Sequence, residues 1–139
     1  MKILVSACLL GENCKYNGKN NFKQTIVDFL IGKQVIPVCP EVLAGLGTPR
    51  TPVEIVDGEV KTKDGISVDK VLREAAQKVV ELALAEGATC AILQSRSPTC
   101  GVKQVYDGSF SGVLVDGQGV LASALSAAGI TLIDAEDVQ

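Results

Sequence analysis

The sequence predicts an α/β fold, a Rossmann-like three-layer sandwich in which a mostly parallel sheet carries helices on both faces and a small hairpin at its edge. Short apolar runs rich in Val and Ile alternate with segments whose apolar residues recur at helical spacing. Right-handed crossovers between parallel strands would place those helices on both faces of the sheet. The length of 139 residues suits one domain spanning residues 1–139, and no repeat or long linker divides it.

Four short apolar runs, each bounded by turn residues, predict the strands of the sheet. They cover residues 2–7, 34–38, 89–93 and 130–133. The first is followed by a loop rich in Gly, Asn and Lys over residues 11–20.

Helical spacing predicts four helices between the strands. The first covers residues 21–33, with Asn20 or Asn21 as its cap, and the second covers residues 40–46 and begins at Pro40. The longest covers residues 67–86, where Ser67 is expected to cap the start and Gly87 to end it. The last lies near residues 121–128.

Two segments lie outside this alternation. Residues 53–56 and 59–62 flank Asp57-Gly58, which is a strong signal for a two-residue hairpin turn. Residues 94–112 are expected to form a loop, and the Gly-rich stretch 109–119 before the last helix gives only a weak signal for an anion site.

Composition excludes several classes of protein. The chain has no His, which removes hydrolases that use a His base and the commonest zinc ligand. A net charge of −3 and the absence of Trp give no indication of a nucleic-acid or membrane partner. The apolar start is too short for a membrane span or a usual signal peptide, so we expect a cytoplasmic protein whose five cysteines are thiols, ligands or catalysts.

Three cysteines follow three different strands. Cys8 follows the first strand, Cys39 the second, and Cys100 lies in the loop after the third. Ligands of an open parallel sheet bind beyond the carboxyl ends of its strands, so these thiols should share one site. Three thiolates with one open position suit either an iron–sulfur cluster or a catalytic zinc ion, and spacing alone does not separate the two.

The other two cysteines are treated separately. Cys90 lies within the third strand among apolar residues, so we expect it to be buried and remote from the site. Cys14 lies in a Gly- and Asn-rich loop and could be a fourth ligand, a reactive thiol or a residue without a role.

Polar residues near these cysteines are the candidates for proton transfer and substrate binding. Glu41 lies two residues after Cys39 at a helix start, and a carboxylate is the natural proton carrier in a chain without His. Ser97 either makes the turn before Cys100 or orients water and substrate. Arg50 and Arg96 either bind substrate, because a guanidinium suits a planar polar substrate or an anion, or are solvated surface residues. Ser95 is a third candidate substrate-binding residue in the same loop as Arg96.

These segments together resemble the thiouracil desulfurase-like family, long filed as a domain of unknown function. The resemblance runs in order over essentially the whole chain, in three blocks, and is most specific in the third, which contains Cys100. The segments are Val5-Ser6-Ala7-Cys8-Leu9-Leu10-Gly11 with Lys15-Tyr16-Asn17-Gly18, Cys39-Pro40-Glu41-Val42 with Gly45-Leu46 and Pro49-Arg50-Thr51-Pro52, and Ser95-Arg96-Ser97-Pro98-Thr99-Cys100-Gly101 with Tyr106-Asp107-Gly108-Ser109-Phe110.

The resemblance implies a [4Fe-4S] cluster held by the residues that match its three ligands, which are Cys8, Cys39 and Cys100. Its free iron would take the sulfur of a thiolated nucleobase, and water would replace that sulfur. Family residues implicated in proton handling match Glu41 and Ser97. The chain departs from the common pattern at Cys14, where members do not always have Cys, and at Asn17, where many have Asp.

The sequence therefore predicts an iron–sulfur-dependent desulfidase whose partner is a small thiolated molecule. Two alternatives from other classes stay open. One is a binding module stabilised by zinc or a cluster, without turnover. The other is a thiol redox or sulfur-carrier protein that uses Cys14 with Cys8.

Overall fold

The central sheet has four parallel strands in the order β2-β1-β5-β8. The computed structural model describes all 139 residues, and its strands are β1 (Lys2–Ser6), β2 (Gln34–Val38), β5 (Cys90–Leu93) and β8 (Thr131–Asp134). Val5 of β1 lies opposite Pro37 of β2 and Ile92 of β5, so the carboxyl ends of these strands meet at one edge. The predicted α/β class and parallel sheet are confirmed.

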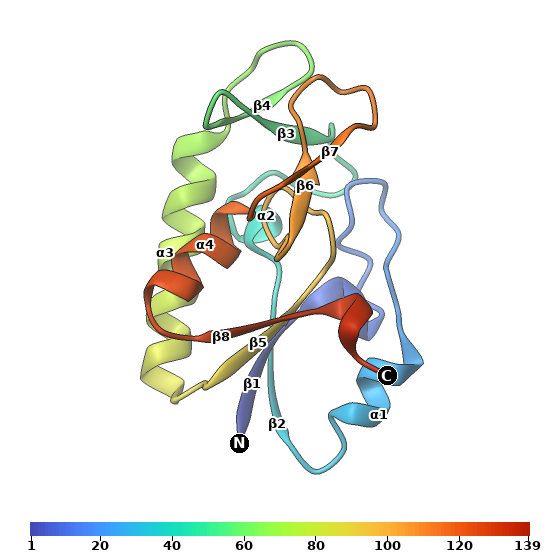
Figure 1. Ribbon diagram of the computed structural model, residues 1–139, viewed down its shortest axis with the longest axis vertical. Helices are drawn as coiled ribbons and strands as arrows, with labels where there is room; N and C mark the ends of the chain where they lie inside the picture. Colours follow the sequence, from blue (N-terminus) through green and yellow to red (C-terminus); the bar gives the residue numbers. More distant parts are fainter.

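Helices cover both faces of the sheet (Figure 1). On one face lie α3 (Asp69–Glu86) and α4 (Val120–Ala127), and on the other lie α1 (Gln24–Phe29) and two 3-10 turns, η1 (Ala7–Leu10) and η2 (Ala135–Asp137). Side chains alternate along β1 accordingly: Leu4 packs in the core beneath α3 and α4, whereas Ile3 and Val5 pack in the core beneath α1. The layers are unequal, since α1 has only six residues.

The helix after β1 is shorter than predicted. It was expected over residues 21–33, but α1 covers Gln24–Phe29 and its N-cap residue is Lys23. The two asparagines proposed as caps have other roles. The side chain of Asn20 accepts a hydrogen bond from the backbone N–H of Phe22, and Asn21 contacts a cysteine described below.

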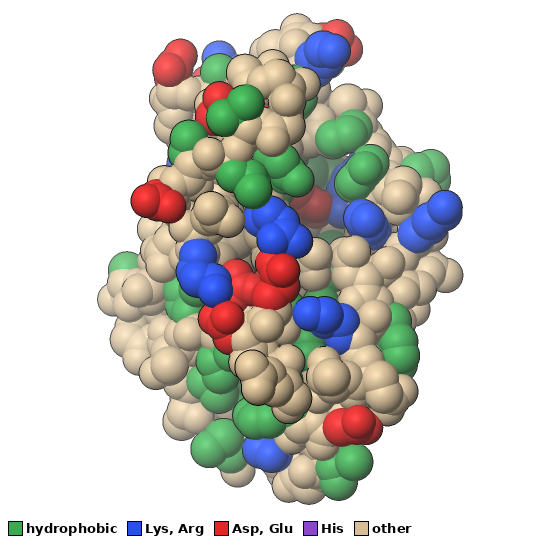
Figure 2. Space-filling model, turned by 45° about the vertical axis from the view of Figure 1, so that its right-hand side comes forward, with side chains coloured by type: hydrophobic (Ala, Val, Ile, Leu, Met, Phe, Trp, Pro, Cys, Tyr) green, Lys and Arg blue, Asp and Glu red, His purple; other side chains and the backbone are tan.

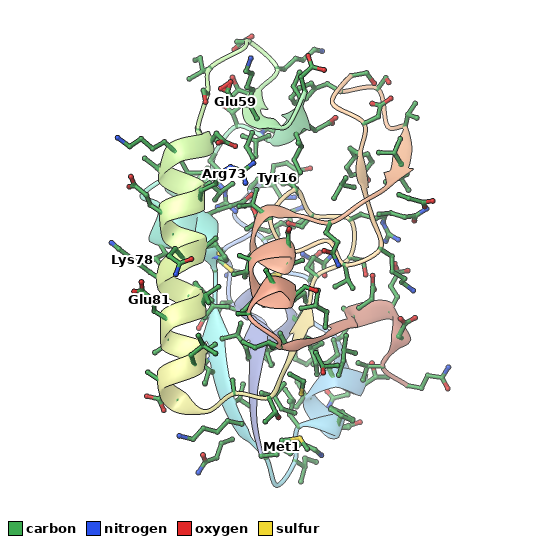
Figure 3. The ribbon with its side chains drawn as sticks, turned by 60° about the vertical axis from the view of Figure 1, so that its left-hand side comes forward. Met1, Tyr16, Glu59, Arg73, Lys78 and Glu81 are labelled. Atoms are coloured by element: carbon green, nitrogen blue, oxygen red, sulfur yellow. The ribbon has the colours of Figure 1, made fainter.

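The longest helix, α3, agrees with its predicted pattern to within two residues. It begins at Asp69, and the hydroxyl of Ser67 accepts the backbone N–H of Asp69 from just outside the helix. It ends at Gly87, which has a φ of 74°. This left-handed conformation suits glycine and terminates the helix. Figure 3 shows Lys78 and Glu81 pointing away from the sheet, as expected for the solvent face of an amphipathic helix.

Two small hairpins lie above the carboxyl ends of the strands (Figure 1). The predicted one pairs β3 (Val53–Val56) with β4 (Glu59–Thr62), and its turn residues Asp57 and Gly58 both have positive φ, as a type I′ turn requires. The second pairs β6 (Gln104–Tyr106) with β7 (Leu114–Asp116). Residues 94–112 were predicted to be a loop, and that prediction is wrong for β6.

A four-residue helix, α2 (Pro40–Leu43), follows β2 and completes the set of elements near this edge. Pro40 begins it, as predicted, although it ends at Leu43 and not at residue 46. None of the helices combines the length and the apolar character that a membrane crossing requires.

Candidate functional site

A cavity of about 890 Å³ is lined by residues that follow the carboxyl ends of the strands and by residues of the two hairpins. Its wall comes from the loops after β1, β2 and β5 and from the hairpins. On the face drawn in Figure 2, acidic and basic side chains gather near the middle, below a hollow. The sequence predicted a ligand site at this position, beyond the carboxyl ends of the parallel strands.

The structure brings Cys8, Cys39 and Cys100 to this one cavity. Cys8 lies in η1 directly after β1, Cys39 lies between β2 and α2, and Cys100 lies in the loop after β5. Cys100 is buried and the other two are half-buried. The structure therefore brings the three thiols to one cavity, although successive members are 31 and 61 residues apart in the chain.

Burial dominates the electrostatics of two of these thiols, Cys8 and Cys100. It raises the pKa of Cys8, and a hydrogen bond from the Asn21 amide to the Cys8 sulfur, at 3.4 Å, opposes that rise. Burial also raises the pKa of Cys100 far above its usual range, and the neighbouring Cys8 and Cys39 thiols add to it. A metal centre binds thiols in their deprotonated form, so its positive charge would offset the cost of placing these sulfurs close together.

Cys14 is a fourth thiol in the wall of the cavity. Its backbone carbonyl oxygen lies 3.8 Å from the sulfur of Cys39. Burial, followed by the neighbouring Cys39 thiol, raises the pKa of Cys14 to about 12. The alternative redox hypothesis paired Cys14 with Cys8, and both thiols line the cavity.

Cys90 does not line this cavity. It is half-buried in β5 and packs against the core beneath α1. Cys90 was expected to be fully buried and is not, but its place outside the cavity agrees with the expected packing role.

The loop that carries Cys100 is fixed by close contacts. The hydroxyl oxygen of Ser97 accepts the backbone N–H groups of Thr99, at 3.1 Å, and Cys100, at 3.0 Å. A Cβ atom placed on Gly119, the residue before α4, would lie 2.4 Å from the carbonyl of Thr99 and 2.9 Å from the nitrogen of Cys100. Ser97 and Gly119 therefore position Cys100, and Ser97 retains its own hydroxyl proton as a donor.

Glu41 is held by two side chains at the cavity wall. One carboxylate oxygen lies 2.5 Å from the Arg50 guanidinium, and the other accepts the Thr99 hydroxyl at 3.1 Å. The side chains of Arg50 and Glu41 are only 7% and 15% exposed. Glu41 is thus fixed in orientation, as a group that transfers protons must be.

The three side chains predicted to bind substrate line the cavity, but their donors already have partners within the protein. Arg50 also donates to the backbone carbonyls of Cys14 and Gly47. Arg96 forms an exposed ion pair with Glu136. The remaining prediction, Ser95, donates to the buried carboxylate of Asp134 at 2.5 Å. Substrate contact by these residues stays a prediction.

Sequence reasoning missed several residues of the wall. Asn21, Tyr16, Tyr106 and Phe110 line the cavity, and Asp134 supports Ser95 from behind. Tyr16, Tyr106 and Phe110 lie within the segments quoted for the resemblance, so their position was signalled without a role. The partners of Ser95 and Arg96 left no signal, because they lie about 40 residues away in the chain.

The donor set restricts which inorganic group would fit. No group of three or more Cys, Asp or Glu side chains is placed so that it could hold a single metal ion. Three thiols that share one cavity without converging on a point suit a larger group that carries several metal atoms, each able to take a thiolate ligand. Cys8, Cys39 and Cys100 are the residues that could hold such a group.

Comparison with known proteins gives one consistent result. A family model described as 2-thiouracil desulfurase matches residues 3–137. The protein YbbK of Bacillus subtilis (strain 168), described as uncharacterized, is 36% identical over 146 residues, which cover 98% of this chain and 97% of that protein. A solved structure described as a [4Fe-4S]-dependent thiouracil desulfidase, TudS, is similar with a TM-score of 0.92 and 36% identity over 99% of this chain and 92% of that chain.

Proposed function

Because this chain belongs to the 2-thiouracil desulfurase family, we propose that it is a desulfidase that removes sulfur from a small thiolated molecule such as a thio-nucleobase. The observation that carries the proposal is the meeting of three cysteines from three separate loops in one cavity. In the overall reaction the carbon–sulfur bond breaks and a carbon–oxygen bond to water forms. Hydrogen sulfide leaves with the protons of the water, and no oxidant or reductant is consumed.

The cofactor that fits this donor set is a [4Fe-4S] cluster. The chain has no His, and the three thiols that line the cavity come from loops that the fold holds at one edge of the sheet. Cys8, Cys39 and Cys100 would hold the cluster, and when bound it would supply an iron without a protein ligand, which is a soft Lewis acid for the sulfur of the substrate. A zinc ion is the less favoured occupant, because no three donors are placed to hold a single ion.

Glu41 is the proton carrier in this proposal. Arg50 and Thr99 hold its carboxylate at the cavity wall, two residues beyond Cys39. From there it can accept a proton from the attacking water and return one to the departing sulfur or ring nitrogen. Ser97 has a hydroxyl proton left to donate to water or substrate, while its oxygen holds the Cys100 loop.

The polar wall sets where a substrate would lie. Arg96 has the most freedom to turn toward a ligand, since 39% of its side chain is exposed and its ion pair with Glu136 lies at the surface. Arg50 and Ser95 act from fixed positions through their ion pair and hydrogen bond.

The five free thiols support a reducing, cytoplasmic location.

The test is anaerobic reconstitution followed by a screen of thio-nucleobases. Brown protein that contains iron and acid-labile sulfide should release sulfide from at least one thio-nucleobase, with an equal amount of the oxo base. A Cys39→Ala variant carried through the same steps is the matched control and should release none. Fully reconstituted protein that releases no sulfide from any thio-nucleobase would contradict the proposal. Colourless protein with bound zinc would favour a binding module, and metal-free protein with a reversible pair of thiols, such as Cys14 with Cys8, would favour a redox protein.

A further inference from the structure

The chain has few aromatic residues, and most of them meet at the cavity. It contains two Tyr, three Phe and no Trp. Both tyrosines and one phenylalanine, which are Tyr16, Tyr106 and Phe110, line the cavity described above. Aromatic side chains are commonly placed in buried cores, but here the aliphatic cores beneath α3 and α1 contain none. Their concentration at the site therefore needs an explanation other than packing.

Phe110 is held in an unusual backbone conformation. Its φ is 57°, in the left-handed region that a bulky residue seldom adopts. The chain retains this conformation because one oxygen of Glu54 accepts two backbone N–H groups, that of Gly108 at 3.0 Å and that of Phe110 at 3.2 Å. Strained residues that the surroundings hold in place are concentrated at functional sites.

The contact between the two hairpins reinforces this arrangement. A Cβ atom on Gly108 would lie 2.6 Å from the backbone oxygen of Ile55, so the turn before Phe110 lies directly on β3. Glu54 also lies in β3. The β3–β4 hairpin therefore fixes the loop that presents Phe110 to the cavity, and Figure 1 shows the two hairpins together at this end of the molecule.

The third ring comes from a different segment of the chain. Tyr16 lies two residues after Cys14, and its backbone carbonyl accepts the N–H of Arg50 at 2.7 Å. Figure 3 shows Tyr16 in the upper half of the molecule, below the β3–β4 hairpin. The cavity is thus lined by rings from two segments, the loop that carries Cys14 and the β6–β7 hairpin.

We propose that Phe110, with Tyr106 and Tyr16, forms an aromatic wall that stacks on the planar ring of the substrate, and that Glu54 is the positioning residue for this wall. The inference rests on the proposed function, because it supplies the ring contact that a thiolated heterocycle needs. The three polar side chains predicted to bind substrate, Arg50, Ser95 and Arg96, offer no flat apolar face, and each already has a partner within the protein. Stacking on an aromatic face tolerates different rings, so it recognises a planar heterocycle and leaves the choice of sulfur to the thiol-bearing end of the cavity.

The experiment measures binding apart from turnover. Uracil has the planar ring but no sulfur to lose, so equilibrium dialysis of radiolabelled uracil against the reconstituted protein reports the ring contact alone. Phe110→Leu keeps an apolar side chain on the same strained backbone and removes the flat face, whereas Phe110→Tyr keeps it. Phe29→Leu is the matched control, because Phe29 lies on α1 and does not line the cavity.

We expect Phe110→Leu to weaken uracil binding by about tenfold, as a lost aromatic stacking contact does, and Glu54→Ala to weaken it by a similar factor. The KM for 2-thiouracil should rise in parallel, with a smaller change in kcat and unchanged iron per chain. Phe110→Tyr and Phe29→Leu should bind as the unaltered protein does.

The proposal is overturned if Phe110→Leu binds uracil as tightly as the unaltered protein at full iron content, or if the unaltered protein does not bind uracil. Loss of iron in both Phe110→Leu and Tyr106→Leu would also overturn it, because the rings would then support the loops and not the ligand. Failure of the proposed function is distinct from these results. It would show as ring-dependent uracil binding in fully loaded protein that releases no sulfide from any thio-nucleobase.

Discussion

The guanidinium of Arg50 lies 2.5 Å from the carboxylate of Glu41, and both side chains are largely buried at the wall of the cavity. Glu41 lies in α2, directly after Cys39, and Arg50 lies in the proline-rich loop after α2, so the ion pair joins these two segments. Arg50 also donates to the carbonyl of Cys14. One buried ion pair therefore links the proposed proton carrier to two of the cysteine-bearing loops, so its two members should respond differently to substitution.

Replacing Glu41 with Gln should separate proton transfer from cluster binding. The Gln keeps the size of the side chain but cannot take up a proton, so turnover should fall by about two to four orders of magnitude. The iron content and absorption spectrum should stay as in the unaltered protein. The unfolding temperature should fall, because Arg50 keeps a buried charge without its partner. Glu86→Gln, which removes an exposed carboxylate paired with Lys2, is the control and should change none of these.

Full turnover in Glu41→Gln at full iron content would show that Glu41 serves only the start of α2. The proton carrier would then have to be sought among Glu12, Glu54 and Asp107, the other carboxylates near these loops.

Replacing Arg50 should affect the fold first. Arg50→Ala leaves the buried Glu41 carboxylate unpaired and removes donors to the carbonyls of Cys14 and Gly47, so the free energy of unfolding should fall by about 3 kcal/mol. Arg50→Lys should recover only part of this loss, since an ammonium cannot reproduce the fork of the guanidinium. Arg73→Ala breaks an exposed ion pair and should cost about 1 kcal/mol or less. Equal losses in Arg50→Ala and Arg73→Ala, measured by denaturant unfolding, would contradict the account of the buried pair.

A methyl group on Gly119 should disturb the cysteine loop. Its Cβ would meet the backbone of Thr99 and Cys100 at 2.4 to 2.9 Å, so the chain must shift just where Cys100 is held. We expect Gly119→Ala to lower the free energy of unfolding by about 1–3 kcal/mol, as overpacking does, and to reduce iron per chain. Gly117→Ala meets only a side-chain atom at 3.4 Å and should be tolerated. If Gly119→Ala binds as much iron per chain as Gly117→Ala, the close contact of Gly119 with the Cys100 loop is not needed to hold the cluster.

Stability should depend on pH through Asp69. Its carboxylate is partly buried, which raises its pKa, but hydrogen bonds from Arg73 and from the backbone N–H of Val60 outweigh this effect and leave the pKa below its ordinary value. A depressed pKa in the folded state gives stability that is complete above the pKa of the unfolded chain, about 3.9. That stability is lost as the pH falls through the lower pKa of the folded state.

Asp69→Asn should therefore lower the free energy of unfolding at pH 7 by about 1 kcal/mol, and the difference from the unaltered protein should shrink at acidic pH. Asp116→Asn, an exposed change on β7, is the control and should have little effect at either pH. A difference for Asp69→Asn that stays constant between pH 7 and the acid limit of folding would rule out this account.

The sequence predicted the sheet and its longest helix because their signals are local and repeated. Apolar runs and the spacing of α3 are visible within a few residues of each other, and Asp57-Gly58 fixes its hairpin by turn geometry alone. The strand β6 was missed because it has three residues in a Gly- and Ser-rich segment and takes its order from pairing with β7. The helix α1 was overextended because Asn20 and Asn21 serve the loop and Cys8 and do not cap the helix.

The position of the site was predictable from the sequence, but the contacts within it were not. The meeting of Cys8, Cys39 and Cys100 followed from the rule that parallel strands share one carboxyl edge, which needs only the order of elements. The partners of Glu41, Ser95 and Arg96 were not predictable, because each comes from a different loop and depends on side-chain packing. The function of the three thiols required the resemblance, since their spacing alone was equally consistent with zinc.

The measurement that tests the central claim most directly is the count of iron and acid-labile sulfide per chain after anaerobic reconstitution of single Cys→Ala variants. The account predicts about four irons and four sulfides in the unaltered protein and in Cys90→Ala, whose thiol lies outside the cavity. It predicts loss of both in Cys8→Ala, Cys39→Ala and Cys100→Ala, in soluble and folded protein. Full iron in any of these three variants, or loss of iron in folded Cys90→Ala, would show that the cluster is held by other residues.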